Sequence, residues 1–267
     1  MKIHHYAILL FIAAIAVLFY LSQKGILPDN PLAVSKLPKK RPKGMVIEMG
    51  NGGGMLPISK GVYISEDSCY QRNWAYRVEN KTYFKLSNQE LDQLYQTFVD
   101  NKFDRIRTLH SQTHDRGGTS VYLRINRKTY QVHNAGSTYI RKGSQSNFGE
   151  VVSNIKKIVA AKISPLLQDF SIQLNQEVID LSLSGHISSP TANISKGFKQ
   201  GDNIPNNITL KFLPGKHHLR ISFTTKDTLT NGKKYLGGAF ELNINPSTKG
   251  IRVLRDSSSV LKFEYFQ

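Results

Sequence analysis

The chain has 267 residues, of which 36 are lysine or arginine and 19 are aspartate or glutamate, so its formal net charge is +17 at pH 7. The positive excess is spread along the chain, whereas a nucleic-acid site concentrates basic residues among aromatic ones. The composition therefore argues against nucleic acid and favours an anionic lipid, wall polymer or acidic glycan as partner. Cys69 is the only cysteine, which excludes an intramolecular disulfide.

The first predicted element is an uncharged apolar run over residues 6–22. A helix of this length just crosses the roughly 30 Å hydrocarbon layer, so we predict a single transmembrane anchor within residues 1–22. A cleaved signal peptide is the alternative, but cleavage at the small-x-small motif of residues 14–16 would leave an apolar stump. We expect an envelope protein of the inner membrane, with its soluble part outside the cytoplasm.

Residues 23–60 are predicted to form an extended, basic linker. The stretch LPDNPLAVSKLPKKRPKG at 27–44 contains four prolines and a basic cluster. Proline fixes φ and cannot donate to a strand ladder, which favours an extended chain. The glycine stretch at 49–55 is predicted to be a mobile connector, because a phosphate-binding loop needs a Gly-Lys-Ser/Thr ending.

Residues 61–165 are predicted to form a small α+β domain with antiparallel strands and two helices. We expect a hairpin that turns near Glu79-Asn80-Lys81 and a second hairpin around Asn126-Arg127-Lys128. Ser87 and Glu90 form a capping box at the start of the first helix, whose apolar stripe is Leu91, Leu94, Tyr95 and Phe98. Asn147 and Glu150 are expected to cap the second helix, which Pro165 ends.

Residues 166–267 are predicted to form a small β-sandwich without a helix. Short alternating runs such as EVIDLSLSG, NITLKFLP and HHLRISFTT are typical of half-buried strands, with turns at Pro214-Gly215, Asn231-Gly232 and Asn245-Pro246. The expected fold class is therefore α+β, with an N-terminal transmembrane helix, the small α+β domain and an all-β Ig-like sandwich.

Two resemblances accompany these patterns. GGGMLPISKGVYISEDSC, LSNQELDQLYQTFVDNKFDRI, HDRGGTSVYLRI and FGEVVSNIKKIV, within about residues 50–160, resemble an uncharacterised family of envelope proteins from Bacteroidota-type bacteria. That resemblance implies no functional residues. The stretch NITLKFLPGKHHLRISFTTKDTLTNGKKYLGG is similar to bacterial Ig-like adhesion or carrier modules. Their features match at Leu213-Pro214-Gly215, Leu219-Arg220-Ile221, Asp227 and Asn231-Gly232-Lys233.

The main candidate metal site is the stretch LHSQTHDRGG, with His110, His114 and Asp115 as ligands. A zinc ion would need a further ligand, such as His133 on the following hairpin. In the alternative interpretation, Asp115 caps the turn before Gly117-Gly118 and Arg116 pairs with a carboxylate. We expect no cofactor and no assigned catalytic residue.

Three other features have two interpretations each. Cys69 is either a nucleophile or, more simply, a small packing residue. His217 and His218 open a strand, so alternation points one inward and one outward and they cannot share a ligand. The aromatic residues Trp74, Tyr76, Tyr83 and Phe84 near the first hairpin form either core or a platform for a glycan or peptide.

Three hypotheses for the function follow. The first is a membrane-anchored binding or scaffold protein without catalysis, with an envelope protein as a possible partner. The second is a metal-dependent hydrolase that uses the 110–115 loop. The third is a basic binder of anionic lipid or wall polymer. The oligomeric state does not follow from the sequence.

Overall fold

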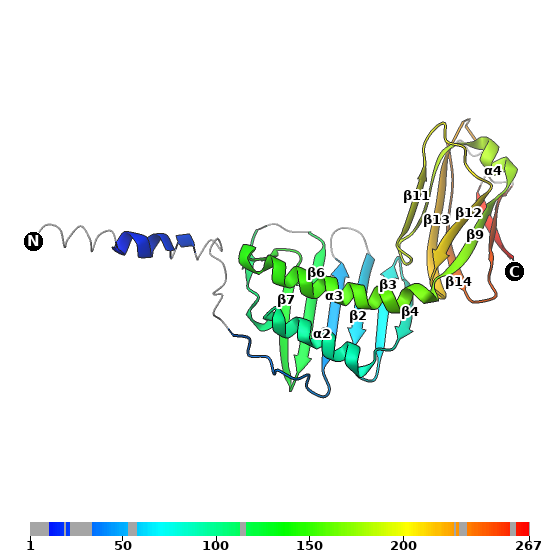
Figure 1. The fold of residues 1–267 in the computed structure, drawn as a ribbon. Coiled ribbons are helices and arrows are strands. Elements are labelled where there is room, and N and C mark those ends of the chain that lie inside the picture. The colour runs from blue at the N-terminus through cyan, green and yellow to red at the C-terminus, as the bar shows by residue number, and fades with distance from the viewer. Residues whose placement is uncertain are drawn as a thin grey trace, which may run out of the picture. The chain divides into compact units, whose positions relative to one another are not determined.

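The computed structural model describes residues 11–18, 20–21, 34–52, 58–112, 116–226, 228–229, 234–256 and 260–266. This part of the chain is mostly β (Figure 1). One sheet has six strands in the order β4-β3-β2-β1-β6-β7, and a two-stranded sheet pairs β5 with β8. Two further sheets have four strands each, in the orders β11-β10-β13-β14 and β12-β9-β15-β16.

The elements up to residue 166 alternate strands with two long helices. They are β1 (Val46–Gly52), β2 (Ile58–Ile64), β3 (Cys69–Ala75), β4 (Val78–Phe84), α2 (Asn88–Asp100), η1 (Phe103–Arg105), β5 (Thr108–His110), β6 (Gly118–Ile125), β7 (Lys128–Asn134), β8 (Thr138–Ile140), η2 (Lys142–Ser144), α3 (Gln145–Ile163) and η3 (Ser164–Leu166).

The remaining elements are strands with one short helix among them. They are β9 (Gln168–Leu174), α4 (Gln176–Leu181), β10 (Ser182–Ser189), β11 (Ile194–Phe198), β12 (Asn207–Phe212), β13 (Gly215–Thr225), β14 (Tyr235–Ile244), β15 (Gly250–Arg255) and β16 (Leu261–Phe266).

The chain divides into two compact units whose segments alternate along the sequence. The first unit comprises Met1–Met55, Tyr63–Cys69 and Leu86–Ile158, and the second comprises Leu56–Val62, Tyr70–Lys85 and Val159–Gln267. The β3–β4 hairpin therefore belongs, apart from Cys69, to the same unit as the two four-stranded sheets.

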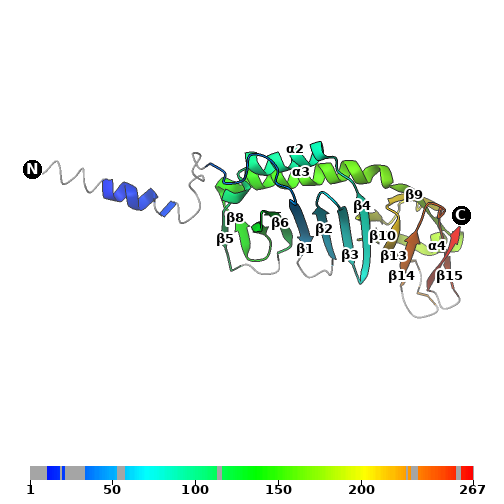
Figure 2. The same ribbon diagram turned by 90° about the horizontal axis from the view of Figure 1, so that it is seen from below.

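In the first unit, α2 and α3 lie on one face of β1 and β6 (Figure 2). Strand β6 pairs with β1 on one side, Met49 opposite Val121, and with β7 on the other, Val121 opposite Val132. These inward-facing residues are buried, and the helices bury Leu91, Leu94, Tyr95 and Phe98 of α2 together with Phe148, Val151 and Ile155 of α3.

The ends of α2 and α3 test the predicted caps. The capping box is confirmed: Glu90 N–H donates to Ser87 Oγ and Ser87 N–H donates to Glu90 Oε2. The predicted cap of the second helix is wrong, because α3 begins at Gln145 and Asn147 lies inside it. There, Asn147 Nδ2 donates to the backbone oxygen of Asn101 at 3.0 Å, so this amide fixes α3 to the C-terminal end of α2.

The structure differs from the prediction of a linker over residues 23–60. Residues 46–52 form β1, and the preceding segment contacts α2 and η1. Arg41 donates to Asp92 Oδ1 at 2.6 Å and also pairs with Glu66, and the hydroxyl of Tyr95 donates to the backbone oxygen of Pro38 at 2.7 Å. The sequence shows Arg41 in a basic cluster but not the distant carboxylates that bind this residue, so the pattern predicted an extended linker.

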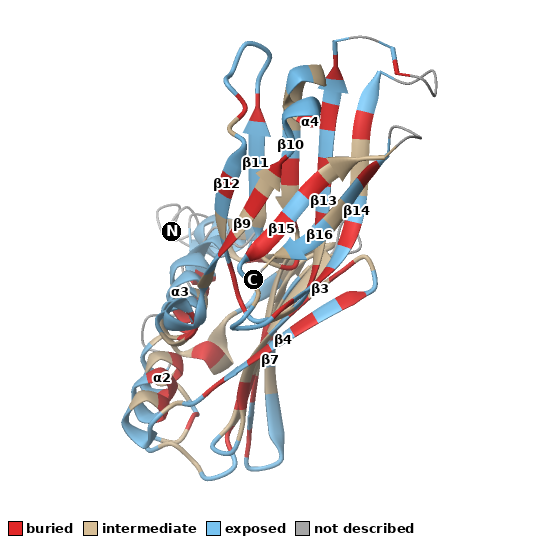
Figure 3. Ribbon diagram, turned by 90° about the vertical axis from the view of Figure 1, so that its right-hand side faces the viewer, coloured by how far each residue is buried: buried red, intermediate tan, exposed pale blue. Residues whose placement is uncertain are grey.

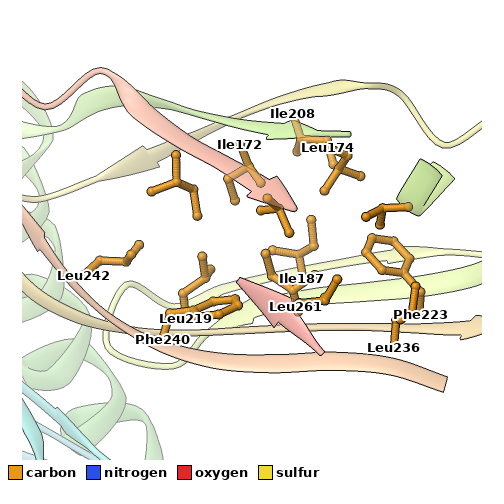
Figure 4. Packing of buried hydrophobic residues seen from close by; sticks show 14 of the residues in the cluster. Ile172, Leu174, Ile187, Ile208, Leu219, Phe223, Leu236, Phe240, Leu242 and Leu261 are labelled. Atoms are coloured by element: carbon orange, nitrogen blue, oxygen red, sulfur yellow. The ribbon is translucent and has the colours of Figure 1, made fainter. Parts of the chain in front are cut away.

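The second unit contains the two four-stranded sheets, which share one hydrophobic cluster (Figure 4). Ile172, Leu174 and Ile208 contribute to this cluster from one sheet, and Leu219 and Phe223 from the other. Burial alternates along β13 and β14, as the colours in Figure 3 show, because each strand has one face toward this core.

Two local predictions in the second unit are wrong. The hairpin turns at Tyr76-Arg77, both with positive φ (50° and 71°), rather than near Glu79-Asn80-Lys81. A two-residue turn of this kind normally uses Asn or Gly, so the sequence gives no signal for it. The run EVIDLSLSG does not form one strand: its first residues form α4, and β10 begins at Ser182. Over only five residues, 177–181, the order of apolar and polar side chains fits the period of a helix as well as that of a strand. The pattern therefore could not separate the two.

The predicted fold class, α+β with an N-terminal transmembrane helix and an all-β C-terminal sandwich, is wrong. Within the described residues the chain is mostly β with several sheets, and α4 lies between β9 and β10. Residues 11–18 and 20–21 are helical, while residues 6–10 and 22 of the predicted anchor lie outside the described residues. In the part of the chain that is described, no helix combines the length and the apolar character needed to cross a membrane.

Candidate functional site

The predicted metal site falls largely outside the described residues, because these do not include His114 and Asp115. His110 is exposed at the end of β5, and its Nδ1 lies 3.3 Å from Ser137 Oγ. His133 instead contacts Ser120, with Nδ1 2.7 Å from the hydroxyl oxygen. The described ranges contain no group of three or more His, Cys, Asp or Glu side chains that could hold a metal ion.

Arg116 and Cys69 have partners that suit a structural role. The guanidinium of Arg116 donates to Asn134 Oδ1 at 3.0 Å and to the Thr138 carbonyl at 2.5 Å, and it lies 4.0 Å from the Tyr139 ring centroid. These acceptors are neutral, in place of the carboxylate that the sequence led us to expect. Burial raises the pKa of the Cys69 thiol, which disfavours the thiolate that a nucleophile requires.

The β3–β4 hairpin has two faces of different character. Because the turn has two residues, Ala75 lies opposite Val78, and counting outward places Tyr70 opposite Tyr83. In β4 the inner side chains are all buried and the outer ones are all exposed. One face is therefore available for packing and the other for contact with a ligand.

The inner face carries a buried polar network with His217 at its centre. Asn80 Nδ2 donates to the Pro214 carbonyl at 3.0 Å and lies 3.2 Å from His217 Nε2, while the Thr82 hydroxyl donates to Asn80 Oδ1 at 3.0 Å. Asn80, Thr82 and His217 are all buried. These contacts join β4 to the start of β13, two segments separated by more than 130 residues in the sequence.

The hydrogen bonds of His217 define its protonation state. Its Nε2 lies 2.8 Å from the Leu213 carbonyl, which can only accept, so we place a proton on Nε2. Its Nδ1, 3.2 Å from Thr191 Oγ1, then accepts from that hydroxyl. Thr191 Oγ1 in turn accepts from the backbone N–H of His218 at 3.1 Å. Burial lowers the pKa of His217, consistent with this neutral form.

The hairpin tip makes a second set of contacts with β13. The centroid of the Tyr76 ring lies 4.9 Å from the centroid of the His218 ring. The same Tyr76 centroid lies 5.3 Å from the guanidinium carbon of Arg220. Next to the hairpin, Lys60 Nζ on β2 donates to Asn193 Oδ1 at 2.7 Å, and Asn193 lies between β10 and β11. His217 is fully buried and His218 is half-buried, so the prediction that they point to opposite sides is confirmed.

The outer face of the hairpin combines aromatic and cationic side chains. Tyr83 is 62% exposed, and its ring lies 5.8 Å from that of Tyr70 in an edge-to-face arrangement. Lys81 Nζ lies 4.7 Å from the Tyr70 ring centroid, and Arg72 Nε lies 3.7 Å from Glu79 Oε1. We call Tyr70, Arg72, Trp74, Glu79, Lys81 and Tyr83 the outer hairpin surface.

The aromatic cluster of the sequence is thus split between the two faces. Phe84 is buried on the inner face and Tyr83 is exposed on the outer one, while Tyr76 occupies the turn. The sequence pattern did not single out Tyr70 and Lys81. Strand alternation places both on the same face as Tyr83, but only once the position of the turn is known. The pattern also missed Asn80 and Thr191, for which no local signal exists, because their partners are distant in the sequence.

No protein-family model matches this sequence, and no curated protein matches it either. Of the Ig-like features, Asp227 and residues 231–233 lie outside the described residues. Both resemblances drawn from the sequence stay predictions.

Proposed function

We propose that this chain is a binding module without catalysis and that its outer hairpin surface binds an acidic polysaccharide. The observation that carries the proposal is the exposed ring of Tyr83 beside Tyr70 and Lys81. An exposed aromatic surface rimmed by polar and charged groups is typical of binding sites.

The chemistry of this surface suits a sugar polymer that carries acidic groups. A tyrosine ring offers its face to the C–H groups of a pyranose, and lysine or arginine pairs with carboxylate or phosphate groups of the same polymer. The segment Tyr70–Lys85 contains four cations and one carboxylate, and the whole chain carries +17. Charge complementarity therefore favours an anionic ligand over a neutral one.

The arrangement of the rings favours a polysaccharide over single-stranded nucleic acid. Proteins that bind single strands present several ring faces on which successive bases stack. Here Tyr70 and Tyr83 meet edge to face and Lys81 lies over the Tyr70 ring, so Tyr83 offers the most open ring face.

The inner face supports the proposal because it holds the hairpin in place. Asn80, held by Thr82, donates to the Pro214 carbonyl and so fixes β4 next to the start of β13, which orders the outer side chains before a ligand arrives. Preorganisation of this kind lowers the entropic cost of binding. We take the two facing sheets to be an Ig-like β-sandwich that acts as the scaffold for this surface.

The test compares the affinity of the full chain for polygalacturonate, an acidic polysaccharide, with that for neutral dextran. Tyr83→Ala and Lys81→Ala should each weaken polygalacturonate binding by about fivefold, since a contact of ~1 kcal/mol corresponds to that change. The matched controls are Tyr235→Ala and Lys211→Ala, an exposed tyrosine and an exposed lysine on other strands.

Three results would contradict the proposal. The first is equal affinity for dextran and polygalacturonate, which would remove the role of charge. The second is an equal loss of affinity in the hairpin variants and in the controls, which would make the interaction non-specific. The third is tighter binding of an oligo-deoxythymidine strand than of polygalacturonate, which would assign the surface to nucleic acid.

A further inference from the structure

Strand β14 ends the sheet β11-β10-β13-β14, so within the described residues no strand pairs with its outer edge, although β16 contacts β14 at the Asn243 end. The N–H of Asn243 donates to the Tyr265 hydroxyl at 2.9 Å, so Asn243 points away from β13. Backbone direction alternates along a strand, so Gly237, Ala239 and Glu241 direct their N–H and C=O groups to the same free side.

This edge lacks the protection that the other terminal strands have. Among the described sheets of four or more strands, each other terminal strand contains a lysine: Lys81 in β4, Lys128 in β7, Lys196 in β11, Lys211 in β12 and Lys262 in β16. Strand β14, YLGGAFELNI, has a single charge, on Glu241, and contains no lysine or proline. Lysine and proline at sheet edges prevent the addition of another strand, so their absence marks β14 as an edge suited to pairing.

We propose that β14 pairs with β14 of a second copy of this chain, antiparallel about a two-fold axis at Ala239. In this register Gly237 lies opposite Glu241 of the partner subunit, and the pairing covers residues 237–241, because the N–H of Asn243 is already bonded to Tyr265. No like charges face each other. In this register the exposed residues of β14 lie opposite exposed residues of the second copy, and buried residues lie opposite buried ones. The buried face of each sheet therefore continues into the buried face of its neighbour.

A second copy fits this edge better than an unrelated peptide because the strand is complementary to itself. The side chains of the open row are small near the axis, with Gly237 and Ala239 at the centre, so two strands can approach without a steric clash. The result is a continuous eight-stranded sheet built from two four-stranded ones. This inference does not depend on the outer hairpin surface.

Net charge gives the dimer a distinctive salt dependence. Each chain carries +17, so two chains repel each other at long range, and added salt screens that repulsion. The dimer should therefore become tighter as ionic strength rises. Binding of an acidic polysaccharide should weaken over the same range, so the two interactions can be told apart in one series of buffers.

The test is sedimentation equilibrium of the full chain, with Ala239→Lys as the main variant. With the axis at residue 239, the two new cations would lie directly opposite each other, so the dissociation constant should rise by about tenfold or more. The matched control is Ser222→Lys, which adds the same charge to the same exposed face but on β13, inside the sheet. A second variant is Ala239→Pro, which removes the N–H of residue 239 that points away from β13. Circular dichroism checks that all three variants fold.

A wild-type dimer that Ala239→Lys and Ala239→Pro dissociate and that Ser222→Lys leaves intact would support the proposal. A wild-type chain that stays monomeric at high concentration and high salt would overturn it. Equal effects of Ala239→Lys and Ser222→Lys would also overturn it, because the charge and not the edge would then be responsible.

Discussion

Replacement of His217 tests the buried hydrogen bonds that this side chain makes at the start of β13, next to the hairpin. In His217→Phe the ring packs in a similar space, but the Leu213 carbonyl loses its partner, while the Thr191 hydroxyl keeps its contact with Ser189 Oγ at 3.3 Å. An unsatisfied buried polar group costs about 1–3 kcal/mol, so the free energy of unfolding should fall by about that amount. His217→Gln keeps a donor that can reach Leu213 and should cost less.

Urea denaturation followed by Trp74 fluorescence measures this loss, because Trp74 is the single tryptophan and lies on the hairpin itself. The signal therefore reports the unit that contains the network. A midpoint for His217→Phe that equals that of the wild type, with an unchanged slope, would refute the assignment of the network as a stabilising element.

The same residue predicts a pH dependence. Burial lowers the pKa of His217 below its ordinary value of 6.5, so the unfolded chain takes up a proton more readily than the folded chain. The stabilisation is complete above pH 6.5 and is lost as the pH falls toward the lowered pKa, with a slope of up to about 1.4 kcal/mol per pH unit. His217→Gln should lack this part of the slope. Identical slopes in both proteins between pH 6.5 and 5 would contradict the buried neutral imidazole.

Three further changes probe the rest of the fold. Ser87→Ala removes the capping box of α2 and should lower the free energy of unfolding by about 1 kcal/mol in thermal or urea denaturation. Gly185→Ala would place a methyl group 2.2 Å from the Phe223 ring in the core, and the required repacking should cost about 1–3 kcal/mol in the same assay. The Cys69 thiol, whose pKa is raised by burial, should react with a thiol reagent much more slowly in the native chain than in urea; equal rates would place it at the surface.

Patterns that depend on neighbours in the sequence were predictable. Ser87 and Glu90 satisfy each other's backbone N–H within one turn, so the capping box is visible in four residues. The turn at Asn126-Arg127 and the buried stripe of α2 are local in the same sense, and the structure confirms both. Each of these features rests on an interaction whose two partners lie within a few residues.

Features that depend on distant partners were not predictable. Asn80 is a frequent turn residue and drew the predicted turn toward itself, but its side chain is buried against Pro214 and His217. Arg41 belongs to a run that suggests a solvated linker, and only the fold brings Asp92 to it. The outer hairpin surface likewise needs the true turn position, because a shift by one residue exchanges the two faces.

The most direct test of the central claim is the fluorescence of Trp74 during titration of the unmodified full chain. Trp74 belongs to the outer hairpin surface and is the chain's single tryptophan, so its emission reports that surface without any substitution. We predict a saturable change in emission with polygalacturonate that weakens with added salt, and no change with dextran. Binding of polygalacturonate, seen by calorimetry, that leaves the Trp74 emission unaltered would place the ligand elsewhere and contradict the account.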